Sequence, residues 1–206
     1  MHLEHEMIES VADLRQLYPE PKGRAIAKQL DRLDVHCRRF IGLSPFAVLA
    51  TTSGDGRLDS SPRGGDPGFV HVRDDRTLWL PDASGNNRLD SLSNVVETGR
   101  VGLLFLIPGV DETLRVNGAA RVCDDAEALG PFDADRRTPR VVLEVTVEEA
   151  YLHCAKALMR SRLWSSEGRG ERSGLPTMGE MLHDQIGGTG PVETQADMVA
   201  RYARDL

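Results

Sequence analysis

The sequence contains few cysteines and no long hydrophobic run. Only three of its 206 residues are cysteines, and Cys37, Cys123 and Cys154 are too widely spaced for a metal site or a disulfide framework. No stretch approaches the run of about 18 apolar residues that a transmembrane helix needs. The N-terminus also lacks the basic and apolar regions of a secretory signal. We therefore expect a cytoplasmic protein in a reducing compartment, without a metal site.

Basic residues are fewer than acidic ones, and familiar catalytic motifs are absent from the sequence. The chain has 25 Lys and Arg against 32 Asp and Glu, which gives a formal net charge of -7. This balance does not favour nucleic acid or an anionic membrane as a partner. The sequence has no GxSxG, HExxH or CxxC pattern, no Walker-type phosphate loop and no GxGxxG after a strand. The sequence therefore gives no support for a hydrolase of these classes, and it does not identify catalytic residues.

Short apolar segments separated by turns predict about six antiparallel strands. Phe46–Thr52 is apolar and rich in strand-forming residues, and the glycines of the following SGDGR are typical of a hairpin turn. Residues 113–122 alternate around Gly118, which indicates a bulge or a close backbone approach. Further strand patterns cover residues 58–61, 68–72, 77–80, 101–107 and 141–147. Without regular crossover helices, the pattern favours a mainly β or α+β fold, a small β-barrel with helices, over a parallel α/β fold.

Helical spacing flanks this β-rich region and also interrupts it once. It covers residues 8–41 in two pieces separated by prolines, an inserted segment at 87–98, and residues 150–164. Two short helices are predicted at 177–186 and 192–204. We therefore divide the chain into an N-terminal helical segment (1–42), a barrel domain (43–164) and a flexible C-terminal tail (165–206), which is rich in Gly, Ser and charge.

Two polar segments are candidates for ligand contact. Residues 60–69 are rich in small residues, which would let a flat ring lie against the backbone, but the same composition suits a solvated loop between strands. Residues 81–88 precede a predicted helix, whose first N–H groups, together with two asparagines and Arg88, could bind a phosphate. An ordinary capped helix with an exposed arginine explains that second segment equally well.

Two further clusters are basic. Arg115 lies within an alternating strand, where it either points to solvent or lines a ligand cleft. His153, Lys156 and Arg160 are spaced to share one helical face, which either grips an anion or is simply solvated. Cys154 follows His153 directly, but neighbours in a helix point about 100° apart and would not form a catalytic dyad.

Taken in order, these segments resemble the pyridoxamine 5'-phosphate oxidase-like, FMN-binding split-barrel proteins. The resemblance extends over about residues 10 to 165. It is carried by the SPRG of residues 61–64, the GNNR of residues 85–88, the LRVNG of residues 114–118 and the HCAKA of residues 153–157. Each motif is weak alone, but the ordered set is specific. It resembles a branch of the family distinct from the oxidase itself.

The resemblance implies a six-stranded antiparallel split barrel that forms a homodimer with two FMN sites at the interface. It places the isoalloxazine ring against four consecutive residues: Ser61, Pro62, Arg63 and Gly64. The ribityl phosphate would be held by Asn86, Asn87 and Arg88, with Ser91 nearby. The oxidases have an Arg-Lys pair where this chain has Asn87-Arg88, so one cation is lost. The hypothesis is that Arg115 and the helix N-terminus compensate.

The family also implies a region that closes over flavin and substrate, and here it corresponds to the segment around His153 and Lys156. The best interpretation of the sequence is an FMN-dependent oxidoreductase with an unknown small substrate. A non-catalytic flavin-binding or sensor protein is one alternative. A split barrel that uses a deazaflavin or haem is another. The residues that bind substrate phosphate in the oxidase have no clear counterparts, so vitamin B6 oxidation is not expected.

Overall fold

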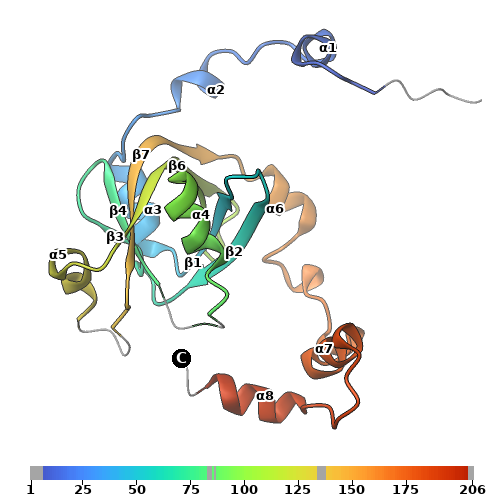
Figure 1. The fold of residues 1–206 in the computed structure, drawn as a ribbon. Coiled ribbons are helices and arrows are strands. Elements are labelled where there is room, and N and C mark those ends of the chain that lie inside the picture. The colour runs from blue at the N-terminus through green and yellow to red at the C-terminus, as the bar shows by residue number, and fades with distance from the viewer. Residues whose placement is uncertain (1–6, 83–84, 86, 134–137, 204–206) are drawn as a thin grey trace, which may run out of the picture.

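The computed structural model describes residues 7–82, 85, 87–133 and 138–203. Its centre is one antiparallel sheet of seven strands in the order β2-β1-β5-β6-β7-β4-β3 (Figure 1). The strands are β1 (Phe46–Thr52), β2 (Leu58–Gly64), β3 (His71–Val72), β4 (Thr77–Pro81), β5 (Arg100–Leu106), β6 (Thr113–Cys123) and β7 (Val142–His153). The expected antiparallel class is confirmed, with seven strands in place of about six because the short β3 pairs with β4.

The main core lies between the sheet and two helices, α3 (Val35–Leu43) and α4 (Asp90–Thr98). The alternation of β1 follows from this arrangement, because Ala47 and Leu49 are fully buried while Ala50 is exposed. A smaller apolar cluster lies under α5 (Ala126–Leu129) and the 3-10 helix η1 (Gly130–Phe132). It contains Trp79 and Phe132.

The glycine inside β6 marks an irregularity, as the sequence predicts. The pairing of β6 with β7 shifts register between Asn117 and Gly118. A Cβ atom at Gly118 would lie 2.0 Å from the carbonyl oxygen of Thr146, so no larger residue fits without movement. The close approach and the register shift occur at the same place, and the expected bulge is confirmed.

The polar segment at residues 60–69 is a strand as far as Gly64, which corrects the alternative that the whole segment is a solvated loop between strands. β2 continues to Gly64 and pairs with β1 along its whole length, with Ser61 opposite Leu49 and Arg63 opposite Ala47. β2 forms one end of the sheet order, so one of its sides has no neighbouring strand within the described residues. An end strand has ladder partners on one side only, and β1 supplies them along the whole of β2, which holds this polar segment in an extended form.

The helix expected at 150–164 is wrong over its first part. β7 runs to His153, pairing opposite Thr113 of β6, and α6 covers only Lys156–Ser161. Beyond the bulge, β6 offers a second run of ladder partners, and this long-range pairing overrides the local helical spacing. His153 and Lys156 therefore do not share a helical face.

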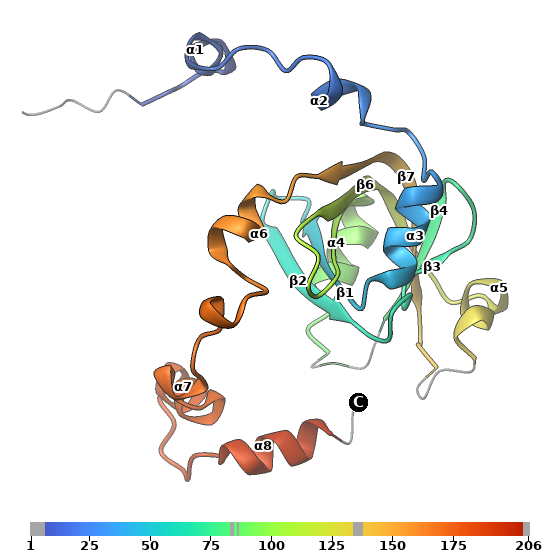
Figure 2. The ribbon, with the colours of Figure 1, turned by 180° about the vertical axis from the view of Figure 1, so that it is seen from behind.

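The two ends of the chain carry short helices outside the sheet. The N-terminal segment forms three helices rather than two pieces, namely α1 (Val11–Leu17), α2 (Arg24–Ala27) and α3, because residues 28–34 are not helical. The two predicted C-terminal helices are present as α7 (Met178–Ile186) and α8 (Gln195–Tyr202), after η2 (Ser166–Gly168) and η3 (Arg172–Gly174). Figure 2 shows α1, α7 and α8 away from the sheet. Within the described residues, none of the helices has the length and hydrophobicity to cross a membrane.

Candidate functional site

The junction of β2 and α4 brings together two of the predicted ligand segments. The Nη2 of Arg63, on β2, donates a hydrogen bond of 3.0 Å to the Oγ of Ser91 in the first turn of α4. The Ser91 hydroxyl in turn donates to the Oδ2 of Asp59 at 2.6 Å. The Nη1 of Arg63 lies 3.6 Å from the Oδ1 of Asp82, just beyond β4. Arg63 of β2 is therefore held by Ser91 of α4 and by Asp82, which follows β4.

A second layer of hydrogen bonds supports this junction from β1. The Nδ2 of Asn94, on α4, donates to the Oγ1 of Thr51 at 2.9 Å, and both residues are buried. The Thr51 hydroxyl lies 3.5 Å from the Oδ2 of Asp59, which also accepts from Ser91. Buried polar networks of this kind fix side-chain orientation, so Asp59 and Ser91 present a defined face to Arg63.

Arg63 nevertheless has one unsatisfied donor. Its Nε is buried and has no hydrogen-bond partner, the only side-chain atom among the described residues of which this is true. An unpaired buried donor costs about 1–3 kcal/mol. Burial also raises the pKa of the neighbouring Asp82, although the charge of Arg63 opposes the rise. Within the described residues, the hydrogen bonding of the junction is therefore incomplete.

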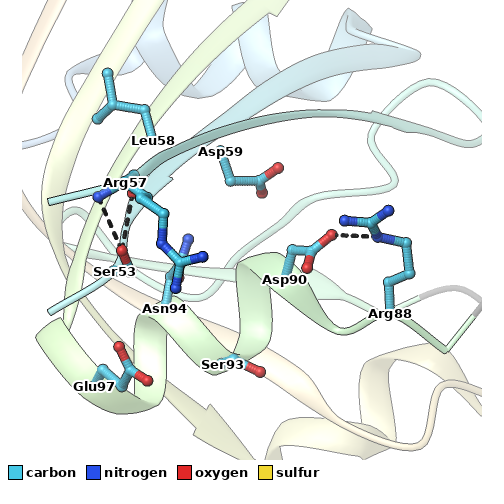
Figure 3. A pocket seen from close by; sticks show the side chains of 9 residues that line it. All are labelled: Ser53, Arg57, Leu58, Asp59, Arg88, Asp90, Ser93, Asn94 and Glu97. Carbon is cyan, nitrogen blue, oxygen red and sulfur yellow. Dashed lines mark hydrogen bonds and ion pairs between the residues drawn. The ribbon is translucent and has the colours of Figure 1, made fainter. Parts of the chain in front are cut away.

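A polar cavity of about 330 Å³ opens beside this junction, between the β1–β2 hairpin and α4 (Figure 3). It is lined by Ser53, Arg57, Leu58, Asp59, Arg88, Asp90, Ser93, Asn94 and Glu97. The Nε of Arg88 donates to the Oδ2 of Asp90 at 2.8 Å, and this bond raises the pKa of the arginine. Two arginines and three carboxylates thus line the cavity. An incoming phosphate would compete with Asp90 for Arg88.

The helix start differs from the sequence prediction in one respect. α4 begins at Asp90, so Asn87 and Arg88 precede the helix instead of forming its first turn. Asn87 and the N-cap residue Leu89 have left-handed backbone with φ of 58° and 59°, and no side chain caps the helix. The first N–H groups of α4 consequently have no side-chain acceptor at the N-cap. Asn86 lies outside the described residues.

Arg115 and His153 line a different surface. They border a mostly apolar groove of about 460 Å³, whose other lining residues are Val48, Ala50, Gly102, Leu103, Leu104, Leu106, Thr113, Asn117, Ala157 and Leu158. The guanidinium of Arg115 lies over the ring of Tyr151, 5.3 Å from its centroid. Lys156 begins α6 next to this groove and does not line it.

The predicted residues therefore fall into two groups on opposite faces of the sheet. Arg63 is paired with Ala47, whose side chain points to the core, whereas the groove contains Val48 and Ala50 from the alternate positions of the same strand. Ser61 lies on the Arg63 face. Pro62 and Gly64 lie on the groove face of β2 and are exposed.

Three residues of the junction were not predicted from the sequence, namely Asp59, Asp82 and Asn94. Asp59 shows a usable signal, because it precedes Ser61 and Arg63 at a spacing of two and so shares their face of β2. Asp82 and Asn94 reach the site only through the pairing of β4 with β7 and the packing of α4 on β1. No local pattern marks them.

Comparison with known proteins places this architecture in a described family. The family model described as pyridoxamine 5'-phosphate oxidase matches residues 33–154, which is more than half of the chain. Among curated proteins, no sequence matches the chain. The matched residues run from just before α3 to just after β7 and include the whole junction of β2 and α4.

Solved structures share the fold at low sequence identity. HupZ of Group A Streptococcus is 16% identical, and the alignment covers 59% of this chain and 99% of that one, with a TM-score of 0.50. An FMN-binding protein from Syntrophomonas wolfei is 13% identical over 57% of this chain and 83% of its own, with a TM-score of 0.45. The haem storage protein HutZ from Vibrio cholerae is 12% identical over 59% and 94%, with a TM-score of 0.43.

Proposed function

We propose that this chain, which belongs to the pyridoxamine 5'-phosphate oxidase family, binds FMN at the junction of β2 and α4 and serves as an FMN-dependent oxidoreductase. The observation that carries the proposal is the bond between Arg63 and Ser91. It joins two segments that are 28 residues apart in sequence and that the family resemblance assigns to one cofactor. The family match supports the fold and the cofactor class, and the junction supplies the residues.

The residues at the junction fit the polar edge of a flavin ring. The side chain of Arg63 is 21% exposed, and an Nη N–H that is not used by Ser91 or Asp82 could donate to a carbonyl oxygen of the bound ring. Pro62 and Gly64 lie on the other face of β2, so the ring would lie along the open edge of this end strand. Arg63 would bind the ring edge, while Ser91 and Asp82 keep its guanidinium in place.

The phosphate end fits less completely. Asn87, Arg88 and the uncapped start of α4 would hold the phosphate, because helix N-termini and arginines both favour anions. Asp90 competes for Arg88 in the structure. We therefore expect a weaker phosphate contribution to affinity than an Arg-Lys pair would provide.

A homodimer is part of the proposal. The groove face of β1 and β5 carries Val48, Leu104 and Leu106, and Phe46 beside them is 37% exposed. A second copy would cover this apolar face by two-fold symmetry. Such an interface would bring Arg115 and His153 of one copy toward the other copy, the arrangement in which they could contribute to a shared cofactor site.

Bound FMN would supply hydride or single-electron transfer, and the protein would supply position and electrostatics. Arg63 would hold the ring edge and stabilise negative charge there. Arg88, Asn87 and the start of α4 would orient the ribityl phosphate. A simple hydride transfer needs no side-chain acid or base, consistent with a sequence that lacks a catalytic motif. We propose a cytoplasmic location and a small-molecule substrate.

The decisive experiment is to purify the protein without added cofactor, record its absorption spectrum, and identify any released chromophore by mass. Released FMN, or tight uptake of added FMN, is the expected result. A colourless protein that does not take up FMN would overturn the proposed function. Turnover of NAD(P)H with an electron acceptor then separates an oxidoreductase from a non-catalytic flavin-binding protein. A released deazaflavin would retain the site and replace the cofactor.

A haem-binding function is the second candidate, and one observation favours it. His153 and Arg115 border a mostly apolar groove. His153 could bind the haem iron, Arg115 could pair with a haem carboxylate, and the apolar side chains could pack on the ring. Titration with hemin tests it directly. A Soret shift that is lost in His153→Ala would favour haem, whereas an unchanged spectrum would exclude this candidate.

A further inference from the structure

The N-terminal arm, defined here as residues 7–27, has apolar side chains with no surface to cover them. Neither α1 nor α2 contains a buried residue. Val11, Leu14 and Leu17 are 74%, 41% and 65% exposed. A helix of seven residues is not stable in water without tertiary contacts. The arm therefore requires an apolar surface that its own contacts in the structure do not provide.

The sequence of the arm nevertheless encodes a helix with one apolar face. Ser10 caps α1 by accepting a hydrogen bond from the backbone N–H of Asp13 at 3.1 Å. Val11, Leu14 and Leu17 follow one another at intervals of three residues, so they lie along one side of α1. A capped amphipathic helix is a segment built to dock by its apolar face.

The surface of α6 complements the arm in both hydrophobicity and charge. Met159 on α6 is 60% exposed and Leu163 beyond it is 46% exposed. Residues 154–166 contain three basic residues, of which Arg162 pairs with Glu167. Residues 7–20, which include α1, contain three acidic residues and one arginine. Within the described part of the chain, Lys156 and Arg160 form no ion pair. Opposite charge around matching apolar residues favours association and sets its orientation.

The geometry directs the arm away from the α6 of its own chain. Leu30 forms two backbone bonds with Ala150, at 3.0 and 2.8 Å, and so anchors the base of the arm on β7. Pro19 and Pro21 then stiffen the segment that leads back to α1. Figures 1 and 2 both show α1 projecting beyond the sheet on the side of α6, at a distance from α6 itself.

We propose that α1 of one copy docks on α6 of a second copy, and that a two-fold dimer makes this exchange twice. Leu14 and Val11 pack against Met159 and Leu163, and Glu9 and Asp13 at the start of α1 face Lys156 and Arg160. The inference rests on the proposed homodimer and adds the contact that joins the subunits outside the sheet. In a two-fold dimer the same contact forms twice, so the exposed apolar side chains of both arms are covered.

The exposed Cys154 next to α6 provides a native probe for this contact. One chain carries Gln16→Cys with Cys154→Ser, and a differently tagged chain keeps Cys154 and the native arm. The two are co-expressed and treated with a short bismaleimide. The expected product is a covalent heterodimer whose linked peptides contain positions 16 and 154. Val96→Cys with Cys154→Ser, on an exposed position of α4, is the matched control and should give little product.

Cross-linking only within one chain, in a variant that carries both cysteines, would overturn exchange with a second copy. The second measurement is the dimer Kd from sedimentation. Leu14→Ser with Leu17→Ser should raise it at least tenfold, while Arg15→Ser with Gln16→Ser on the same helix should not. Equal Kd values for the two variants would refute the docking. A monomeric native protein would overturn the dimer as well, whereas flavin content tests the cofactor separately.

Discussion

Arg63 on β2 and Ser91 on α4 are joined by a hydrogen bond of 3.0 Å, and this bond ties a strand at the end of the sheet to the start of a helix. Asp59 accepts from the same serine, so the arginine is held through a neighbour on its own strand as well. Arg63 is thus anchored at both of its Nη atoms, to Ser91 and Asp82, while its Nε has no partner.

Arg63→Ala should weaken FMN binding by about 10- to 100-fold, because a charged hydrogen bond contributes about 1.5–3 kcal/mol. Quenching of flavin fluorescence during titration measures the Kd. Arg57→Ala removes an equal charge from the rim of the neighbouring cavity and serves as the control, with a much smaller expected change. An equal loss in both variants would mean that net charge, and not the position of Arg63, governs affinity.

Ser91→Ala tests whether the helix positions the arginine. The variant removes the acceptor for Arg63 and the donor to Asp59, two buried interactions whose loss costs about 1–2 kcal/mol of unfolding free energy. We expect a lower Tm and a Kd for FMN several-fold higher, measured on the same preparation. Ser93→Ala, in the same helical turn, should leave both quantities close to native. Unchanged affinity in Ser91→Ala would show that Arg63 is held without the serine.

Glu144→Gln should destabilise the fold in a pH-dependent way. Glu144 accepts from the Nε1 of Trp79 at 3.0 Å and from the Nε of Arg121 at 2.7 Å, and its side chain is 12% exposed. Burial alone would raise its pKa, but these bonds and the charges of Arg121 and Arg73 together lower it below the usual 4.5. Since the folded state favours the ionised form, this stabilisation is present above about pH 4.5 and lost as the pH falls through the folded pKa.

The native protein should therefore lose stability below about pH 4.5, and the Glu144→Gln variant should lose less over the same interval. At neutral pH we expect the variant to be less stable by about 1–3 kcal/mol in urea denaturation. Glu148→Gln breaks an exposed ion pair with Arg100 and should destabilise the protein much less than Glu144→Gln. Parallel pH profiles for native and Glu144→Gln proteins would contradict this account of the carboxylate.

Gly118→Ala should destabilise the sheet at the β6 bulge. The new Cβ would lie 2.0 Å from the Thr146 carbonyl oxygen, so the two strands would have to separate. Overpacking of this kind costs about 1–3 kcal/mol or more, which corresponds to a Tm lowered by roughly 3–10 °C in a chain of this size. Gly42→Ala, in α3 with open space around the added methyl group, is the control. A native Tm for Gly118→Ala would show that β6 and β7 can accommodate an added methyl group at this position.

The sequence predicts those parts of the fold in which a local pattern coincides with the final environment. β1 alternates because one of its faces packs on the core, and Gly118 signals the bulge because only glycine tolerates the close backbone. Near His153 the local spacing predicts a helix, but the chain continues as β7. The strand is stabilised by pairing with β6, which lies about 40 residues earlier in the chain. A ladder formed at that separation leaves little trace in neighbouring residues.

The same distinction applies to the candidate site. Arg63 and Ser91 could be assigned to one ligand only through the family resemblance, because spacing alone does not bring β2 to α4. Asp82 and Asn94 enter through tertiary packing and were missed. Arg115 was expected beside the phosphate residues, but the side-chain period of two places it on the other face of the sheet, so within one chain it does not join them.

The end position of β2 has a consequence for solubility. An uncovered strand edge exposes backbone donors and acceptors to which a strand of another molecule can add, and such edges are common starting points for aggregation. β2 carries Pro62, which has no N–H to offer, and Asp59 and Arg63, whose charges disfavour close stacking of strands. The polar residues of this strand therefore also protect the protein from uncontrolled strand addition.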